Sequence, residues 1–198
     1  MGGGLSVAAV AEPESLLDLV PARRGHFEYE SGHHGDLWLD LDTLLLRPRR
    51  LQPYVSQLAH QVALHGLEVV CGPLVGGAFV AHSVAAELDV GFCYSVRRDG
   101  AYELPGAFGP AVTGRRVAGV DDVVNAGSAV LGTAAAVRAA GGVLTSVGAL
   151  LALGDSATAV GAAATVPFEH LAAMPTALWT VTDCPLCAAG DPLDPPPS

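Results

Sequence analysis

The stretch VAGVDDVVNAGSA, residues 117–129, contains four apolar residues, two consecutive acids and a loop of small residues. An uninterrupted apolar run is typical of a strand that is buried on both faces of a parallel sheet. Two carboxylates directly after such a strand are costly to bury unless a ligand or water meets them. The carboxyl ends of parallel strands are also where open α/β sheets bind ligands. The stretch therefore predicts an α/β fold with a binding site at residues 121–129.

Residues 125–129, NAGSA, are small enough for backbone N–H groups to close around a phosphate. The helix that we expect to begin at Gly127 adds a dipole that favours negative charge at this point. Asp121 and Asp122 beside the loop are suited to hold sugar hydroxyls or the hydration shell of Mg²⁺. The alternative is structural: the two acids cap the helix and Gly127 makes a tight turn.

The flanking sequence repeats the alternation of short apolar strands and helices. The expected elements are a helix over 49–65, a strand over 67–71, a helix over 78–88, strands over 90–96 and 117–120, a helix over 127–140 and a strand over 143–153. This order predicts one α/β domain with a parallel central sheet and helices on both faces.

Four segments differ from this pattern. We predict a flexible N-terminus over 1–14, a small strand-rich flap over 25–42, a mobile loop over 98–115 and a disordered tail over 191–198. Glycine or proline is frequent in all of them except the flap, which contains Phe27, Tyr29, Leu37, Trp38 and Leu39. Residues 15–190 are expected to form the single domain.

The composition excludes several classes of protein. Of the 198 residues, 51% are hydrophobic and 15% charged, which argues against intrinsic disorder. The net charge is -10 and all ten basic residues are arginine, so nucleic acid and anionic membrane surfaces are not expected partners. No apolar run is long enough for a membrane span, no secretory leader is recognisable, and four cysteines are too few for a disulfide scaffold. A cytoplasmic location fits best.

The acid-pair stretch resembles the PRPP-binding signature of type I phosphoribosyltransferases, and its loop is most similar to that of orotate phosphoribosyltransferase. Three further segments resemble that family in the right order. They are the flap motif FEYESG at 27–32, a pyrophosphate loop GPLVGG at 72–77, and Arg97-Arg98 before the mobile loop. The resemblance spans roughly residues 15–155.

The resemblance implies transfer of ribose 5-phosphate from PRPP to a nitrogenous base, as in pyrimidine nucleotide synthesis, with release of pyrophosphate. It implies Mg²⁺ bound together with PRPP, no metal site made by the protein alone, and a homodimer. The resemblance implies that Asp121 and Asp122 are the catalytic residues and that Asn125 and Trp38 bind the base. The implied PRPP site contains both acids and twelve further residues: Val123, Val124, Asn125, Ala126, Gly127, Ser128, Ala129, Arg97, Arg98, Gly72, Gly76 and Gly77. Trp38 either stacks on the base or fills the core of the flap.

The chain departs from the family at its lysines. The positions that carry a lysine in orotate enzymes are here Glu30, Gly76, Arg98 and Ala101, and Glu103 replaces a histidine. The phosphate loop is therefore intact while the mobile loop and the base pocket are altered. This leaves a second class of function open, a non-catalytic PRPP sensor or regulatory protein.

Cys184-Pro185-Leu186-Cys187 has the form of half a zinc site. A structural zinc needs four ligands, and no second pair lies nearby in the sequence. We therefore favour two reduced thiols in a C-terminal turn over zinc at Cys184 and Cys187. A zinc shared across a dimer or completed by a distant histidine stays open. His33 and His34 in the flap either contact substrate or sit on a turn.

Overall fold

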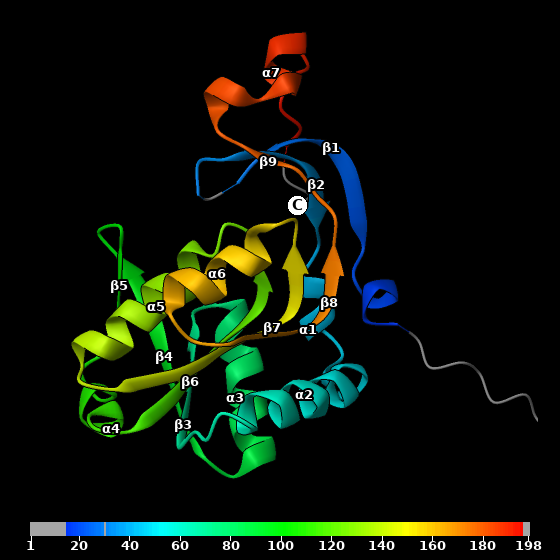
Figure 1. Cartoon of the computed structure of the whole chain (residues 1–198). Helices are drawn as coiled ribbons and strands as arrows, with labels where there is room; N and C mark the ends of the chain where they lie inside the picture. The colour runs from blue at the N-terminus through cyan, green and yellow to red at the C-terminus, as the bar shows by residue number, and fades with distance from the viewer. Residues whose placement is uncertain (1–14, 30, 196–198) are drawn as a thin grey trace, which may run out of the picture.

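The computed structural model of the chain describes residues 15–29 and 31–195. The predicted flexible N-terminus over 1–14, Glu30 and residues 196–198 of the predicted tail lie outside these described residues. The described chain forms a central sheet and a smaller sheet beyond the carboxyl ends of the central strands (Figure 1). Within the described residues, no helix combines the length and the hydropathy that crossing a membrane requires.

The central sheet has six strands in the order β5-β4-β3-β6-β7-β8. The strands are β3 (Val69–Pro73), β4 (Gly91–Arg98), β5 (Ala101–Glu103), β6 (Arg116–Val124), β7 (Val143–Leu153) and β8 (Phe168–Met174). All neighbours pair in parallel except β5, which forms an antiparallel hairpin with β4. The prediction of a parallel central sheet is confirmed.

Helices cover both faces of this sheet (Figure 1). Helices α2 (Pro48–Ala63) and α3 (Gly76–Leu88) pack on one face, and α5 (Ser128–Ala139) and α6 (Ser156–Ala164) on the other. Strand β7 is apolar on both faces and so needs a cover on each: its consecutive residues Ala149 and Leu150 are fully buried in two cores on opposite sides of the sheet. The remaining short helical elements are η1 (Leu16–Leu19), α1 (Asp42–Leu45), α4 (Gly109–Val112), η2 (Val181–Asp183) and α7 (Pro185–Ala189).

Strand β6 continues past the acid pair, whereas the sequence predicted its end at residue 120. The cause is the long neighbour β7, which offers backbone partners as far as Ala152 opposite Val124. Asp121 and Asp122 therefore lie inside a paired strand and not on a loop. Their backbone positions are fixed by ladder hydrogen bonds.

Part of the predicted mobile loop over 98–115 has regular structure, because it contains β5 and α4. Val112 is fully buried and Phe108 packs against Tyr94, with ring centroids 4.9 Å apart. Tyr102 of this segment lies against Gly132 of α5: a Cβ atom added to Gly132 would be 2.3 Å from the Tyr102 ring. The expectation of an irregular loop is corrected by these contacts, and movement of the segment over a ligand stays a prediction.

The flap is a three-stranded antiparallel sheet of β1 (Ala22–Glu28), β2 (His34–Leu39) and β9 (Leu178–Trp179). The third strand comes from the C-terminal part of the chain, so the flap is larger than the predicted 25–42. In its core the Trp38 ring lies 5.6 Å from that of Phe27 and 6.4 Å from that of Tyr29. Strand β9 was not predicted, since two half-buried residues leave no periodic signal.

Residues 191–195 of the predicted disordered tail lie along β1. The backbone N–H of Asp194 donates to the carbonyl of His26 at 2.7 Å, and the N–H of His26 donates to the Asp194 carboxylate at 3.0 Å. Arg23 adds an ion pair with Asp194 at 3.4 Å. Tertiary hydrogen bonds thus order a segment whose composition alone indicates disorder.

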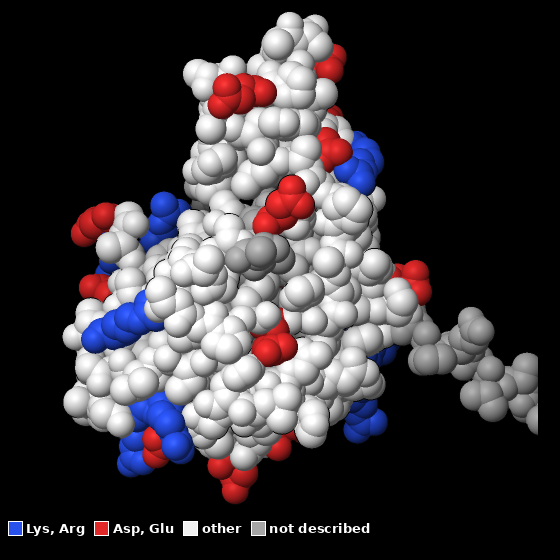
Figure 2. Space-filling model, in the orientation of Figure 1, with Lys and Arg blue, Asp and Glu red and all other residues white. Residues whose placement is uncertain are grey.

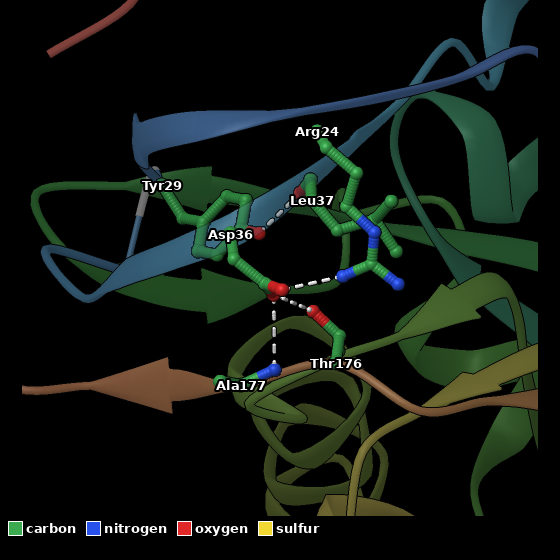
Figure 3. A network of polar contacts seen from close by, with 6 residues as sticks. All are labelled: Arg24, Tyr29, Asp36, Leu37, Thr176 and Ala177. Carbon is green, nitrogen blue, oxygen red and sulfur yellow. Dashed lines mark hydrogen bonds and ion pairs between the residues drawn. The ribbon is translucent and has the colours of Figure 1, made fainter. Parts of the chain in front are cut away.

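Asp36 on β2 connects the flap to the segment that follows β8 (Figure 3). Its carboxylate accepts hydrogen bonds from the Thr176 hydroxyl at 3.0 Å and from the Ala177 N–H at 3.1 Å, and it forms an ion pair with Arg24. Burial acts to raise the pKa of Asp36, but the two hydrogen bonds and Arg24 outweigh it and hold this pKa below its usual value. The charged carboxylate therefore stabilises the position of the flap.

We expect Asp36→Asn to lower the free energy of unfolding by about 1–2 kcal/mol at neutral pH. Because the folded-state pKa is depressed, this contribution is present above the unfolded pKa of about 3.9 and is lost as the pH falls through the folded value. Urea unfolding at pH 7 and at acid pH measures it, with Asp155→Asn as a control at an exposed residue whose side chain makes no capping hydrogen bond. A difference between Asp36→Asn and wild type that does not shrink in acid contradicts this account.

Candidate functional site

A pocket of about 260 Å³ lies between the flap and the carboxyl end of β6. The flap supplies aromatic and apolar walls, and β6 with the loop after it supplies the polar wall. The lining residues are Tyr29, Ser31, Leu37, Trp38, Leu39, Leu41, Asp121, Val123, Val124, Asn125, Ala126, Gly127, Ser128, Ala129 and Leu153. One cavity thus unites the predicted phosphate loop with both predicted base-site residues, Asn125 and Trp38.

Both acids are buried, with exposed fractions of 5% for Asp121 and 9% for Asp122. Asp121 Oδ1 accepts the N–H of Asp122 at 3.0 Å, and Asp122 Oδ1 accepts the N–H of Val123 at 2.9 Å. Desolvation by burial, reinforced by the neighbouring charge of Asp122, raises the pKa of Asp121 well above its usual range. A group with such a perturbed pKa is typical of a binding site, and the Asp121 carboxyl is suited to bind a hydrogen-bonding or cationic ligand.

The glycines of the predicted pyrophosphate loop lie directly against the acids. A Cβ on Gly76 would be 2.1 Å from Asp122 Oδ2, and one on Gly77 would be 2.4 Å from Asp121 Oδ1. A Cβ on Gly72 would be 2.4 Å from the carbonyl oxygen of Gly77. The 72–77 loop therefore packs tightly beside β6, because its three glycine positions have no room for a side chain.

The loop after β6 has the geometry expected of an anion site. Gly127 is the N-cap of α5 with φ of 77°, and a Cβ there would be 2.4 Å from Val160. Backbone N–H groups at the start of this 12-residue helix have no intrahelical partner and are suited to bind an anion. Asn125 Oδ1 is buried without a hydrogen-bond partner, so the pocket wall also holds an acceptor in need of a donor.

Arg97 and Arg98 are not among the residues that line the pocket. They lie at the end of β4, where Arg98 Nε contacts Glu103 Oε1 of β5 at 3.2 Å. Of the positions that carry a lysine in orotate enzymes, only Arg98 is basic in this chain, and Glu103 pairs with it. The sequence analysis predicted both arginines in the PRPP site; the structure places them on the β4–β5 hairpin, and their contact with PRPP stays a prediction.

The pocket wall contains no arginine among the described residues, and the chain has no lysine. On the face shown in Figure 2, uncharged residues predominate and the basic side chains lie scattered between acidic ones. An anion in the pocket would therefore be held by backbone N–H groups and the dipole of α5. The two carboxyls offer oxygen atoms of the type that hydrated Mg²⁺ and sugar hydroxyls prefer.

The sequence did not predict six of the pocket residues: Tyr29, Ser31, Leu37, Leu39, Leu41 and Leu153. Tyr29 and Ser31 belong to the flap motif, so that motif contained the signal. Leu153 ends β7, the strand beside β6, and only the strand order places it at the pocket. Asp122, Gly72, Gly76 and Gly77 adjoin the acid side of the site without lining this cavity.

We expect Asp121→Asn to raise the free energy of unfolding of the ligand-free protein by about 0.5–2 kcal/mol at pH 7. The raised pKa means that the folded state keeps a proton longer, so wild-type stability falls as the pH rises from about 3.9 through the folded value. Asparagine removes this loss because it is neutral throughout. Urea unfolding from pH 4 to 8 measures the effect, and an unchanged pH profile in the variant would count against it.

Comparisons with known proteins identify the family of this chain. No protein-family model matches the chain. It is 31% identical over 191 residues to the orotate phosphoribosyltransferase of Caldanaerobacter subterraneus subsp. tengcongensis, covering 94% of this chain and 98% of the relative.

Solved structures show the same fold. The Mycobacterium tuberculosis orotate phosphoribosyltransferase in complex with PRPP matches with a TM-score of 0.57 and 23% identity, over 69% of this chain and 80% of that one. Adenine phosphoribosyltransferase from Thermoanaerobacter pseudethanolicus matches with a TM-score of 0.61 and 18% identity, over 79% and 96%. A parallel sheet that ends in an acid pair and a phosphate-type loop, together with a full-length relative, places this chain in the orotate phosphoribosyltransferase family of type I phosphoribosyltransferases.

Proposed function

We propose that this protein transfers ribose 5-phosphate from PRPP to a nitrogenous base and releases pyrophosphate. The observation that carries the proposal is the pocket in which the flap faces Asp121 and the 125–129 loop. The PRPP complex of the Mycobacterium tuberculosis relative supports PRPP as the ligand class.

In this proposal the 5-phosphate lies at the N-terminus of α5. Its oxygens accept hydrogen bonds from the backbone N–H groups of residues 126–129, and Ser128 adds a hydroxyl. The left-handed conformation of Gly127 turns the loop so that it leads into α5. Because these donors are backbone groups, the absence of lysine in the chain leaves them unaffected.

Asp121 and Asp122 are proposed to accept the ribose 2- and 3-hydroxyls. Transfer passes through a positively charged, oxocarbenium-like C1, and a buried carboxylate stabilises such charge strongly because the local dielectric is low. Residues 72–77 are proposed to donate backbone N–H groups to the pyrophosphate, and Mg²⁺, when bound, neutralises charge on the leaving group. The acids take part in holding its hydration shell.

The acceptor base is proposed to lie under the flap, between the ring of Trp38 and the amide of Asn125. The unpartnered Oδ1 of Asn125 accepts one N–H of the base, and the aromatic wall stacks on its ring. No cation in the described pocket wall pairs with a carboxylate on the base. We therefore propose that orotate, an anion, is a poor acceptor compared with a neutral base.

The Arg98–Glu103 ion pair favours a second candidate, a PRPP-binding sensor without turnover. Family enzymes place a lysine and a histidine where this chain has Ala101 and Glu103, and here the remaining cation already has a partner. A transferase and a sensor both bind PRPP, but only a transferase releases pyrophosphate when a base is present.

We expect Mg²⁺-dependent PRPP binding in calorimetry, and a loss of binding in Asp121→Asn and Asp122→Asn that remain folded. In a steady-state assay with PRPP, Mg²⁺ and orotate, uracil or purine bases, we expect pyrophosphate release with a neutral base. Removing one preorganised donor from a transition state costs about 10²–10³ in rate, so orotate turnover should fall well below about 1 per second.

The controls separate the outcomes. Asp155→Asn should bind PRPP and turn over like wild type. PRPP binding without pyrophosphate release from any base would establish the sensor, and equal binding by the acid variants would remove the acid pair from the site. Orotate turnover of about 1–10³ per second would contradict the electrostatic argument.

We also propose a homodimer that forms near the pyrophosphate loop. Leu74, Val75 and Phe79 form an apolar surface there and are 46%, 61% and 55% exposed. The same segment contacts the acids through Gly76 and Gly77, so a second copy would lie beside the site.

We expect wild type to elute as a dimer in light scattering at micromolar concentration and Phe79→Glu to be a monomer, because a buried charge without a partner is costly. Leu64→Glu is the matched control, since Leu64 is 74% exposed at the far end of α2 and should leave the dimer intact. A monomeric wild type would overturn the proposal.

A further inference from the structure

Four side chains of types that can bind metal ions meet on the side of the flap that faces the C-terminal segment. They are His26 on β1, His34 at the start of β2, Cys184 just before α7 and Cys187 within α7. One ligand atom from each lies within 4.8 Å of all the others. His26, His34 and Cys184 are buried, with exposed fractions of 4%, 4% and 2%. His34 is therefore neither on a turn nor at the pocket.

The separations match the edges of a tetrahedral zinc site. His26 Nε2 and His34 Nδ1 are 3.0 Å apart, and Cys187 Sγ is 3.2 Å from His34 Nδ1. Cys184 Sγ and Cys187 Sγ are 3.4 and 3.6 Å from His26 Nε2. Zinc bonds of about 2.0 Å to nitrogen and 2.3 Å to sulfur give tetrahedral edges of about 3.3–3.8 Å.

Hydrogen bonding alone does not account for this convergence. Three ligand atoms, from His34, Cys184 and Cys187, lie within 3.6 Å of His26 Nε2. A neutral imidazole nitrogen has one lone pair and accepts one hydrogen well. A shared cation satisfies all four atoms at once.

A hydrogen bond from the other ring nitrogen of His26 already fixes the orientation of the imidazole ring. Nδ1 lies 2.9 Å from the carbonyl oxygen of Asp191, to which it donates as N–H. This hydrogen bond selects the tautomer whose Nε2 lone pair points into the cluster, an arrangement that is common for metal-bound histidine. Asp191 itself is held by its N–H, which donates to the Leu186 carbonyl at 3.0 Å.

We propose that His26, His34, Cys184 and Cys187 bind one structural Zn²⁺. Two thiols and two imidazoles in a tetrahedron are typical of zinc, and four protein ligands leave no open position for catalysis. On binding, the two thiol protons go to solvent, and Zn²⁺ with two thiolates is neutral overall. The sequence prediction favoured free thiols because the completing histidines lie far away in the chain, which the flap brings next to α7.

The role of the metal follows from the elements it joins. It connects the first two strands of the flap to the helix after β9, so it fixes the C-terminal segment to the flap that covers the pocket. This inference does not rest on the proposed transferase activity, since zinc content and activity are measured independently.

The test starts from the full chain, purified under reducing conditions without chelator. Mass spectrometry of metals should find about one zinc per chain, and Co²⁺ in its place should give the intense absorption of a tetrahedral thiolate site. Cys187→Ser and His34→Gln should reduce the zinc content to about one tenth or less. His33→Gln is the matched control, because His33 is adjacent in sequence but its Nδ1 lies 3.2 Å from the Ser31 hydroxyl.

Circular dichroism shows that each protein compared is folded. Wild-type protein that is folded, carries no zinc and takes up none when Zn²⁺ is added would overturn the proposal. So would a Cys184–Cys187 disulfide in the reduced preparation, or zinc content in Cys187→Ser and His34→Gln equal to wild type. If the variants fail to fold, the metal content and cobalt spectrum of wild type still decide.

Discussion

The burial of two adjacent carboxylates at the end of β6 is the constraint on which the rest of the site depends. Asp121 and Asp122 are almost inaccessible, and the close contacts around them come from glycine backbone and not from a cation. Burying two adjacent carboxyl groups without a counter-ion disfavours their charged form, which is why the pKa of Asp121 is raised. Here the long pairing of β6 with β7 holds the acids in place, and Gly76 and Gly77 make room for them.

The pocket exists because the flap is held above this strand end from two directions. Asp36 fixes β2 to the segment after β8, and the C-terminal residues 191–195 pair along β1. Both attachments join parts of the chain that lie far apart in sequence. The histidine–cysteine cluster lies on the same side of the flap as the second attachment, so a metal there would add to a connection that the hydrogen bonds already make.

Because this member of the family has no lysine, backbone N–H groups have a larger share in binding any anionic ligand. In the proposed binding mode, a phosphate at the start of α5 would be bound by N–H groups and the helix dipole, neither of which needs a basic side chain. The base and pyrophosphate ends are different, because cations in family enzymes serve there and Arg98 pairs with Glu103 instead. Under the proposed function, the altered electrostatics would therefore affect turnover and acceptor choice more than PRPP binding.

The local sequence determined the features that depend on neighbouring residues: the parallel strands, the acid pair, and the NAGSA loop that opens α5. Periodicity and turn residues report these directly, so the predicted strand over 143–153 coincides with β7. Only the tertiary structure decided the features made by distant residues. Strand β9, the order of residues 191–195 and the meeting of His26 with Cys184 depend on pairings that span most of the chain, which no local pattern encodes.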